Sequence, residues 1–173
     1  MFRQTIATLS LALIPFSPSL IACETNSAVT RISAIQGEGS QSPLLNEIHT
    51  VNAVVVGDFQ GAARLNGFFV QQAQGDENPN TSEGLFVYDR DFGIDVKPGD
   101  RVWVTGRVEE YSGLTQLSHI TELKICKQNV ELPATPLLLP LDSPAAYESL
   151  EGMAVAVQEP LTLIGTHNLG RYG

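Results

Sequence analysis

The sequence predicts an all-β protein, and three observations support this fold class. Fifteen glycines and ten prolines stand mostly between short valine-rich stretches, a pattern typical of strands joined by tight turns. No long segment repeats its apolar residues with the period of an amphipathic helix. A hydrophobic share of 43% against 17% charged residues supports a packed core and argues against extended disorder.

Five segments have the pattern of strands. The clearest covers residues 101–109, where Val102, Val104 and Val108 alternate with polar or bulky side chains. Gly106 interrupts this strand and marks a bend. The expected strands are residues 50–59, 67–72, 84–89, 101–109 and 117–126. Five strands within about 80 residues predict a small Greek-key barrel of the OB-fold type.

The N-terminal residues 1–22 are expected to be a signal peptide. Arg3 precedes an apolar stretch, and the small residue Ala22 stands at the expected cleavage point. Pro15 and Pro18 break this stretch as a membrane-spanning helix, so we expect no stable membrane insertion. Cleavage would remove one of 10 basic residues and leave 19 acidic ones, a net charge of about −10. The protein is therefore expected to be secreted.

Cys23 allows two interpretations. Residues 20–23 match a lipobox, in which a lipid on Cys23 would make the chain an outer-membrane lipoprotein. In an oxidising compartment, Cys23 and Cys126 would instead form a disulfide. That bridge would close a loop of about 100 residues, worth roughly 4–5 kcal/mol in the chain-entropy model. The even cysteine count favours the disulfide.

The composition changes after Cys126. Residues 132–141 carry three prolines among leucines and predict an extended connector that packs along the barrel. Ser143 and Pro144 predict the start of a short helix. The strand expected at residues 153–157 has no evident partner. The predicted organisation is thus a signal peptide (1–22), an OB-like barrel (23–131), and a connector with a truncated β segment (132–173), ahead of a catalytic domain beyond the chain.

No catalytic constellation is evident in the sequence. None of the three histidines belongs to a pair with metal-ligand spacing or stands beside an aspartate in a recognisable dyad. The sequence contains no nucleophile elbow and no phosphate-binding loop. The pI near 4.6 argues against binding of DNA by bulk positive charge.

A polar loop at residues 75–84 offers many hard oxygens. Calcium prefers six to eight such ligands, and the alternate spacing resembles part of an EF-hand loop. The alternative is a solvated hairpin turn, which the same residue types favour. The candidate calcium ligands are Asp76, Asn78, Asn80, Ser82 and Glu83.

Aromatic side chains are expected on the outward face of three strands. If the alternate residues fill the barrel, these side chains face out and can stack on bases at about 1–3 kcal/mol each. The alternative is that the connector or a following domain covers them. The candidate nucleic-acid contacts are Phe69, Gln71, Phe86, Tyr88, Trp103 and Arg107.

Several stretches in this order resemble the N-terminal OB-like domain of bacterial secreted nucleases of the endonuclease/exonuclease/phosphatase superfamily. They are residues 32–37, 42–44, 54–61, 65–71, 81–88, 98–102, 104–106, 113–117 and 168–173. The resemblance implies an extracellular DNase that uses a divalent metal, Mg²⁺ or Ca²⁺, in a domain beyond Gly173. It also implies that Cys23 and Cys126 pair. Gln72 and Glu77 depart from the family pattern.

These features predict a non-catalytic module that binds single-stranded or duplex DNA weakly. The alternatives are a structural module that contacts its own downstream catalytic domain, and a module that binds an extracellular glycan. Fold alone does not separate these functions.

Overall fold

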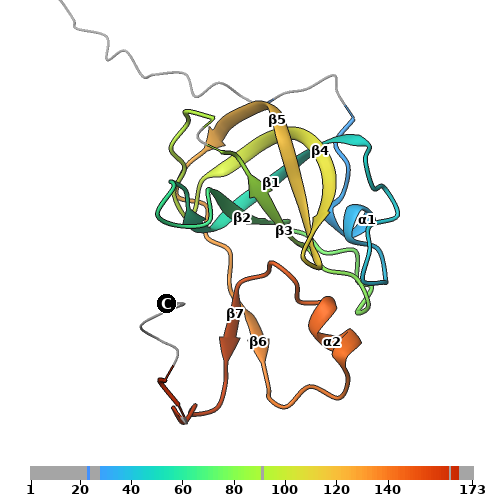
Figure 1. Ribbon diagram of the computed structural model, residues 1–173, viewed down its shortest axis with the longest axis vertical. Helices are drawn as coiled ribbons and strands as arrows, with labels where there is room; N and C mark the ends of the chain where they lie inside the picture. Colours follow the sequence, from blue (N-terminus) through green and yellow to red (C-terminus); the bar gives the residue numbers. More distant parts are fainter. Residues whose placement is uncertain (1–22, 24–27, 91, 164, 168–173) are drawn as a thin grey trace, which may run out of the picture.

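The computed structural model describes residues 23, 28–90, 92–163 and 165–167, so the predicted signal peptide lies outside the described residues. Five strands form a closed barrel in the order β1-β2-β3-β5-β4 (Figure 1). They are β1 (Ile48–Phe59), β2 (Gly67–Gln71), β3 (Gly84–Tyr88), β4 (Arg101–Tyr111) and β5 (Leu114–Lys127).

The pairing of the strands is that of an OB-type barrel. The long strand β1 pairs antiparallel with both β2 and β4. Strands β3 and β5 close the barrel in parallel, and their register covers only Phe86 with Gln116 and Val87 with Leu117. A five-stranded, partly open Greek-key barrel is what the OB-fold denotes. The predicted all-β class and OB-like barrel are confirmed.

The alternating pattern of the strands fills the barrel. Val102, Val104 and Val108 are completely buried in one cluster with Phe68 and Leu117. The bend predicted at Gly106 is present, because the β4–β5 register shifts between Thr105 and Arg107. A Cβ at Gly106 would lie 2.8 Å from the backbone oxygen of Ser118 and 2.7 Å from Cδ1 of Ile120, so a side chain does not fit there.

A short helix that the sequence analysis did not predict precedes the barrel. Helix α1 (Ile32–Gln36) places Ile32 and Ile35 in the barrel core. The helix ends at Gly37, which has a positive φ of 69°. The three-residue spacing of the two isoleucines before a glycine was the signal for this helix.

The C-terminal unit consists of β6 (Thr135–Leu137), α2 (Pro144–Glu148) and β7 (Val155–Val157). As predicted, Ser143 caps α2, since its side chain accepts a hydrogen bond from the backbone N–H of Ala146. The expectation that residues 153–157 lack a partner is wrong. The connector itself forms β6, which pairs with β7 in parallel. This unit lies below the barrel in Figure 1 rather than along it.

A disulfide joins Cys23 to Cys126, with 5.4 Å between their Cα atoms. It ties the N-terminal segment to the end of β5 and confirms the predicted pair. A sulfur in a disulfide cannot also carry a lipid, so the lipoprotein alternative is not supported. Among the described residues, no helix is long and apolar enough to cross a membrane.

Candidate ligand-binding site

Three aromatic rings form a row across the outer face of the barrel. Phe59, Phe69 and Phe86 come from β1, β2 and β3 in turn. The ring centroids of Phe59 and Phe69 are 5.9 Å apart with an edge-on arrangement, and those of Phe69 and Phe86 are 4.8 Å apart. These three residues are called the aromatic row.

Two glycines make room for the aromatic row. A Cβ at Gly57 would lie 2.9 Å from Cε2 of Phe59, and a Cβ at Gly67 would lie 2.6 Å from Cζ of Phe86. The rings of Phe59 and Phe86 therefore occupy the space that a side chain at these glycines would need. Phe59 was not among the predicted site residues, although the glycine two positions before it is a sequence signal for this packing.

The aromatic row ends at a cavity where the barrel opens. Beyond Val87 and Leu117 the strands β3 and β5 no longer pair. Residues of both strands at this point line a cavity of about 840 Å³, within the usual range for ligand sites of roughly 300–1,000 Å³. Its walls are the β1–β2 loop, the end of β3 and the β4–β5 hairpin, and it is called the β3–β5 cavity.

The β3–β5 cavity is lined by two arginines as well as by the carboxylate of Asp89. Arg64 from the β1–β2 loop and Arg90 after β3 both line it. Within the described part of the chain, neither guanidinium lies within ion-pair distance of a carboxylate. Arg64 makes a long hydrogen bond of 3.4 Å to the backbone oxygen of Asp58. In a protein of net charge −9, two unpaired arginines at one cavity favour an anionic ligand.

The structure brings together three of the predicted contacts. Phe68, Val70, Leu85 and Val87 fill the core, so the assignment of strand faces is confirmed. Phe86 and Tyr88 line the β3–β5 cavity, and Phe69 packs on Phe86. Phe86 is only 4% exposed, so it forms a wall of the site, whereas the ring of Tyr88 is partly accessible.

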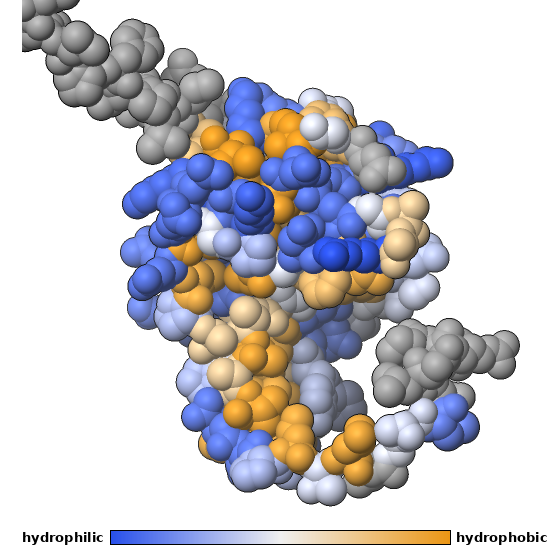
Figure 2. All heavy atoms as spheres, turned by 90° about the vertical axis from the view of Figure 1, so that its left-hand side faces the viewer, coloured by the Kyte–Doolittle hydropathy of each residue, from blue (hydrophilic) through white to orange (hydrophobic). Residues whose placement is uncertain are grey.

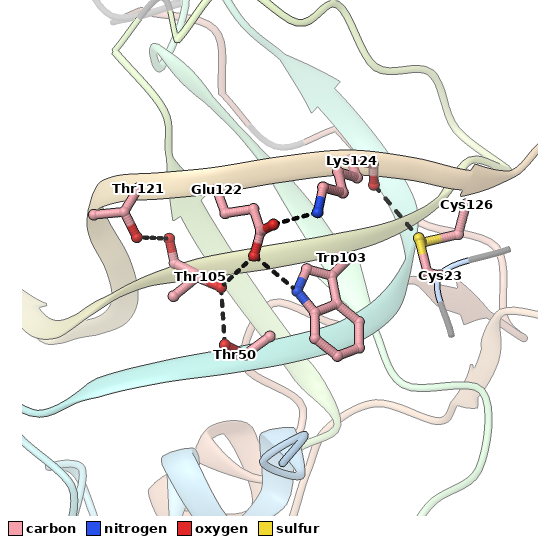
Figure 3. Close-up of polar contacts among 8 residues, drawn as sticks. All are labelled: Cys23, Thr50, Trp103, Thr105, Thr121, Glu122, Lys124 and Cys126. Atoms are coloured by element: carbon pink, nitrogen blue, oxygen red, sulfur yellow. Dashed lines mark hydrogen bonds and ion pairs between the residues drawn. A yellow bond between two sulfur atoms is a disulfide. The ribbon is translucent and has the colours of Figure 1, made fainter. Parts of the chain in front are cut away.

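The other predicted contacts lie elsewhere. Trp103 is 3% exposed, and its Nε1–H donates to Oε2 of Glu122 at 3.2 Å (Figure 3). Lys124 also bonds Glu122 and holds the pKa of that carboxyl below its usual value. Arg107 donates to the backbone oxygen of Asn46, and Gln71 accepts from the backbone N–H of Ala154. None of these predicted contacts lines the cavity.

The side chains of the predicted calcium loop mostly accept hydrogen bonds from backbone N–H groups of the same loop. Oδ1 of Asp76 accepts from the backbone N–H of Asn78 at 2.9 Å, which lowers the pKa of Asp76. Asn78 in turn accepts from the backbone N–H of Asn80, and Glu83 accepts from that of Asp76. Ser82 points away and donates to the backbone oxygen of Glu151.

Across the described residues, no three His, Cys, Asp or Glu side chains are grouped so that they could share a metal ion. The loop also offers the amide oxygens of Asn78 and Asn80 and backbone oxygens. Calcium binding by the loop stays a prediction.

The chain was compared with known protein families, curated proteins and solved structures, and one solved structure is similar to it. No protein family and no curated protein matches the chain. A solved structure of the hypothetical protein ygiW from E. coli is similar to it, with 16% sequence identity and a TM-score of 0.38. The match covers 58% of this chain and 92% of that one. The fold assignment therefore rests on the strand order and closure of the barrel.

Proposed function

We propose that the barrel binds single-stranded nucleic acid along the aromatic row and in the β3–β5 cavity. The main observation in support is that the aromatic row ends at Phe86, which also lines the cavity between the β1–β2 loop and the β4–β5 hairpin. OB-folds bind oligonucleotides on the face of strands 2 and 3, between these two loops. Aromatic rings there give stacking surfaces that any base can use.

We use the charges and aromatic rings of the site to propose where the bases and the phosphates of a bound strand lie. With a net charge of −9, the protein gains nothing from general attraction to a polyanion. Affinity must come from stacking and from local cations. We place bases against Tyr88 and the edge of Phe86, and the phosphates beside Arg64 and Arg90.

We further propose that the barrel is the non-catalytic module of a secreted DNase. The sequence resemblance supports this parent activity. The disulfide between Cys23 and Cys126 supports an oxidising compartment such as the cell exterior. In this proposal the barrel holds the strand while a separate domain cleaves it with Mg²⁺ or Ca²⁺.

One observation favours a second candidate function, a contact with the downstream catalytic domain. The C-terminal unit exposes apolar side chains, and Figure 2 shows apolar surface on this part of the molecule. Exposed apolar patches often mark protein contacts. The side chains are those of Leu138, Val155, Val157, Leu161 and Leu163.

Fluorescence anisotropy with a labelled oligo-dT strand at low salt tests the nucleic-acid proposal. The protein should bind, and Tyr88→Ala should weaken binding by about 1–3 kcal/mol per stacked base. Tyr147→Ala is the matched control, because Tyr147 is exposed on α2 and does not line the cavity. If the unaltered protein does not bind, or if the two variants bind alike, the contact function is the better explanation.

A further inference from the structure

The small sheet of the C-terminal unit pairs through alternate residues of β7. Its two strands, β6 and β7, form a parallel ladder with each other alone within the described part of the chain. The backbone oxygen of Ala154 accepts from the N–H of Thr135 at 2.8 Å, and the N–H of Gln158 donates to β6 at 3.0 Å. Because backbone groups alternate in direction along a strand, this register turns those of Val155 and Val157 away from β6.

The two outer edges of this sheet differ in their capacity to pair. On β6 the residue that faces outward is Pro136, which has no backbone N–H to donate. On β7 the outward residues are Val155 and Val157, and no other described segment bonds their backbone groups. Proline protects an edge strand from pairing, so the outer edge of β7 is the one that a further strand can join. It is called the open edge.

Apolar side chains border the open edge. In Figure 1, β7 lies to the left of β6, so the open edge points to the side of the molecule that Figure 2 shows. Apolar surface runs down the C-terminal unit in that view. Val155 and Val157 are 39% and 36% exposed, and Leu161 after the strand is 70% exposed. A strand that joined the open edge would therefore also cover apolar surface.

The unit that carries the open edge is acidic throughout. The sequence has no lysine or arginine between Lys127 and Arg171. Carboxylates in this stretch are exposed at four positions, Glu131, Asp142, Glu148 and Glu159. A second copy of the chain would bring the same negative charges together, and a nucleic acid would be repelled as well. Lysines or arginines on a partner protein would instead complement the charge of this surface.

We propose that the open edge of β7 binds an extended, basic segment of a partner protein, which adds a third strand to the β6–β7 sheet. The inference is independent of nucleic-acid binding. It rests on the second candidate function, a protein contact of the C-terminal unit, and names the geometry of that contact and the chemistry of the partner. Backbone hydrogen bonds to Val155 and Val157 supply affinity in this mode, and the side chains of the added strand supply specificity.

Fluorescence anisotropy with a labelled peptide of sequence KVTVTVK tests the pairing. The peptide alternates apolar and polar residues and carries a lysine at each end. One control peptide has the same sequence with N-methyl groups on two successive central residues, so it keeps its charge but loses a donor on each edge. A second control, EVTVTVE, reverses the charge. The protein should bind KVTVTVK about tenfold more tightly than either control, the change expected when about two hydrogen bonds are lost.

Val157→Pro gives a second, independent readout. The substitution removes an N–H from the open edge, whereas the bonds between β7 and β6 use the residues on either side of Val157. Binding of KVTVTVK should weaken about tenfold. Val157→Thr is the matched control, because it keeps both the N–H and the β-branched shape, and it should bind the peptide like the unaltered protein. Circular dichroism checks that both variants fold.

The possible results separate the proposals. Equal binding of KVTVTVK and its N-methylated form would overturn strand pairing and leave a contact through apolar side chains standing. Equal or tighter binding of EVTVTVE would overturn the basic partner, and binding of none of the three peptides would overturn the inference as a whole. A dimer in sedimentation that Val157→Pro dissociates would overturn it in favour of a second copy. Binding of oligo-dT to the same proteins decides the nucleic-acid function separately.

Discussion

The ring of Phe86 lies over the backbone of Gly67, where the Cβ of any other residue would stand 2.6 Å from Cζ of that ring. Gly67 sits opposite Tyr88 in the β2–β3 ladder, so the backbone cannot move away without breaking the pairing. The same Cβ would lie 2.2 Å from the backbone oxygen of Val87, so any side chain at position 67 would press on the β3 backbone as well as displace Phe86.

We expect Gly67→Ala to lower the free energy of unfolding by about 1–3 kcal/mol, the usual cost of overpacking. Urea denaturation followed by circular dichroism measures this. Gly39→Ala is the matched control, because a Cβ at Gly39 meets nothing within 4 Å. Equal midpoints for the two variants would show that neither Phe86 nor the backbone oxygen of Val87 resists the added Cβ.

The strands could be predicted from the sequence, but the site only in part. Alternation along residues 101–109 predicts which side chains of that strand fill the barrel, and the same alternation in the other strands correctly predicts that Phe69 and Phe86 face outward. The alternation does not predict which strands are neighbours. Trp103 faces outward too, yet it stands near the start of β4, whereas the cavity is lined by the end of that strand, and Glu122 engages its indole.

The cavity itself depends on contacts between distant segments. It lies where β3 and β5 pair over two residues only. The nearby β4–β5 register shift, with a positive φ of 46° at His119, has no residue-type signal. The partner of β7 was missed for a similar reason. The proline-rich connector is predicted only to be extended. Its pairing with residues 155–157 requires the chain to turn back through α2, which the local sequence does not reveal.

The disulfide should contribute strongly to stability. Cys23 and Cys126 are 103 residues apart in sequence, so the bridge constrains a long segment of the unfolded chain. Replacement of both cysteines by serine should lower the free energy of unfolding by about 2–5 kcal/mol. Urea unfolding with and without reductant measures the change. Peptide mapping of exported protein without reductant should recover the two cysteines in one linked pair, and a lipid on Cys23 would contradict the structure.

Glu151 joins the C-terminal unit to the barrel. Its Oε1 accepts from the backbone N–H of Thr115 at 3.0 Å and from Nε2 of Gln36 at 3.2 Å. Burial raises the pKa of Glu151 above its usual value, and repulsion from Glu148 and Glu110 adds to the rise, while the two hydrogen bonds oppose it. The folded protein thus binds a proton at this group more tightly than the unfolded chain does.

The sign of the pH dependence follows from that shift. The stability gained from proton binding at Glu151 is fully present below its unfolded pKa and is lost as the pH rises through the folded pKa. Glu151→Gln stays neutral and keeps an acceptor, so its stability relative to the unaltered protein should increase between about pH 4 and pH 7. Denaturation at both pH values measures this difference. The exposed Glu131 provides the control, Glu131→Gln, and an equal change in both variants would contradict the role of Glu151.

The salt dependence of binding should reveal how many phosphates the protein contacts. For single strands, log K falls against log salt concentration with a slope of about −0.7 for each phosphate neutralised. The β3–β5 cavity offers two unpaired arginines, Arg64 and Arg90, so the slope should be about −1.4. A protein that bound by general charge would show a much steeper slope.

Arg64→Gln and Arg90→Gln should each flatten the slope to about −0.7. Arg101→Gln is the matched control, since Arg101 is exposed at the start of β4, where it donates to Asn52 and does not line the cavity. Each of the three substitutions removes one positive charge, so the net charge of the protein changes equally in all three variants. If the slope becomes shallower by the same amount in Arg101→Gln, the net charge of the protein governs binding. If it becomes shallower in Arg64→Gln and Arg90→Gln alone, the bound phosphates must lie at the cavity wall.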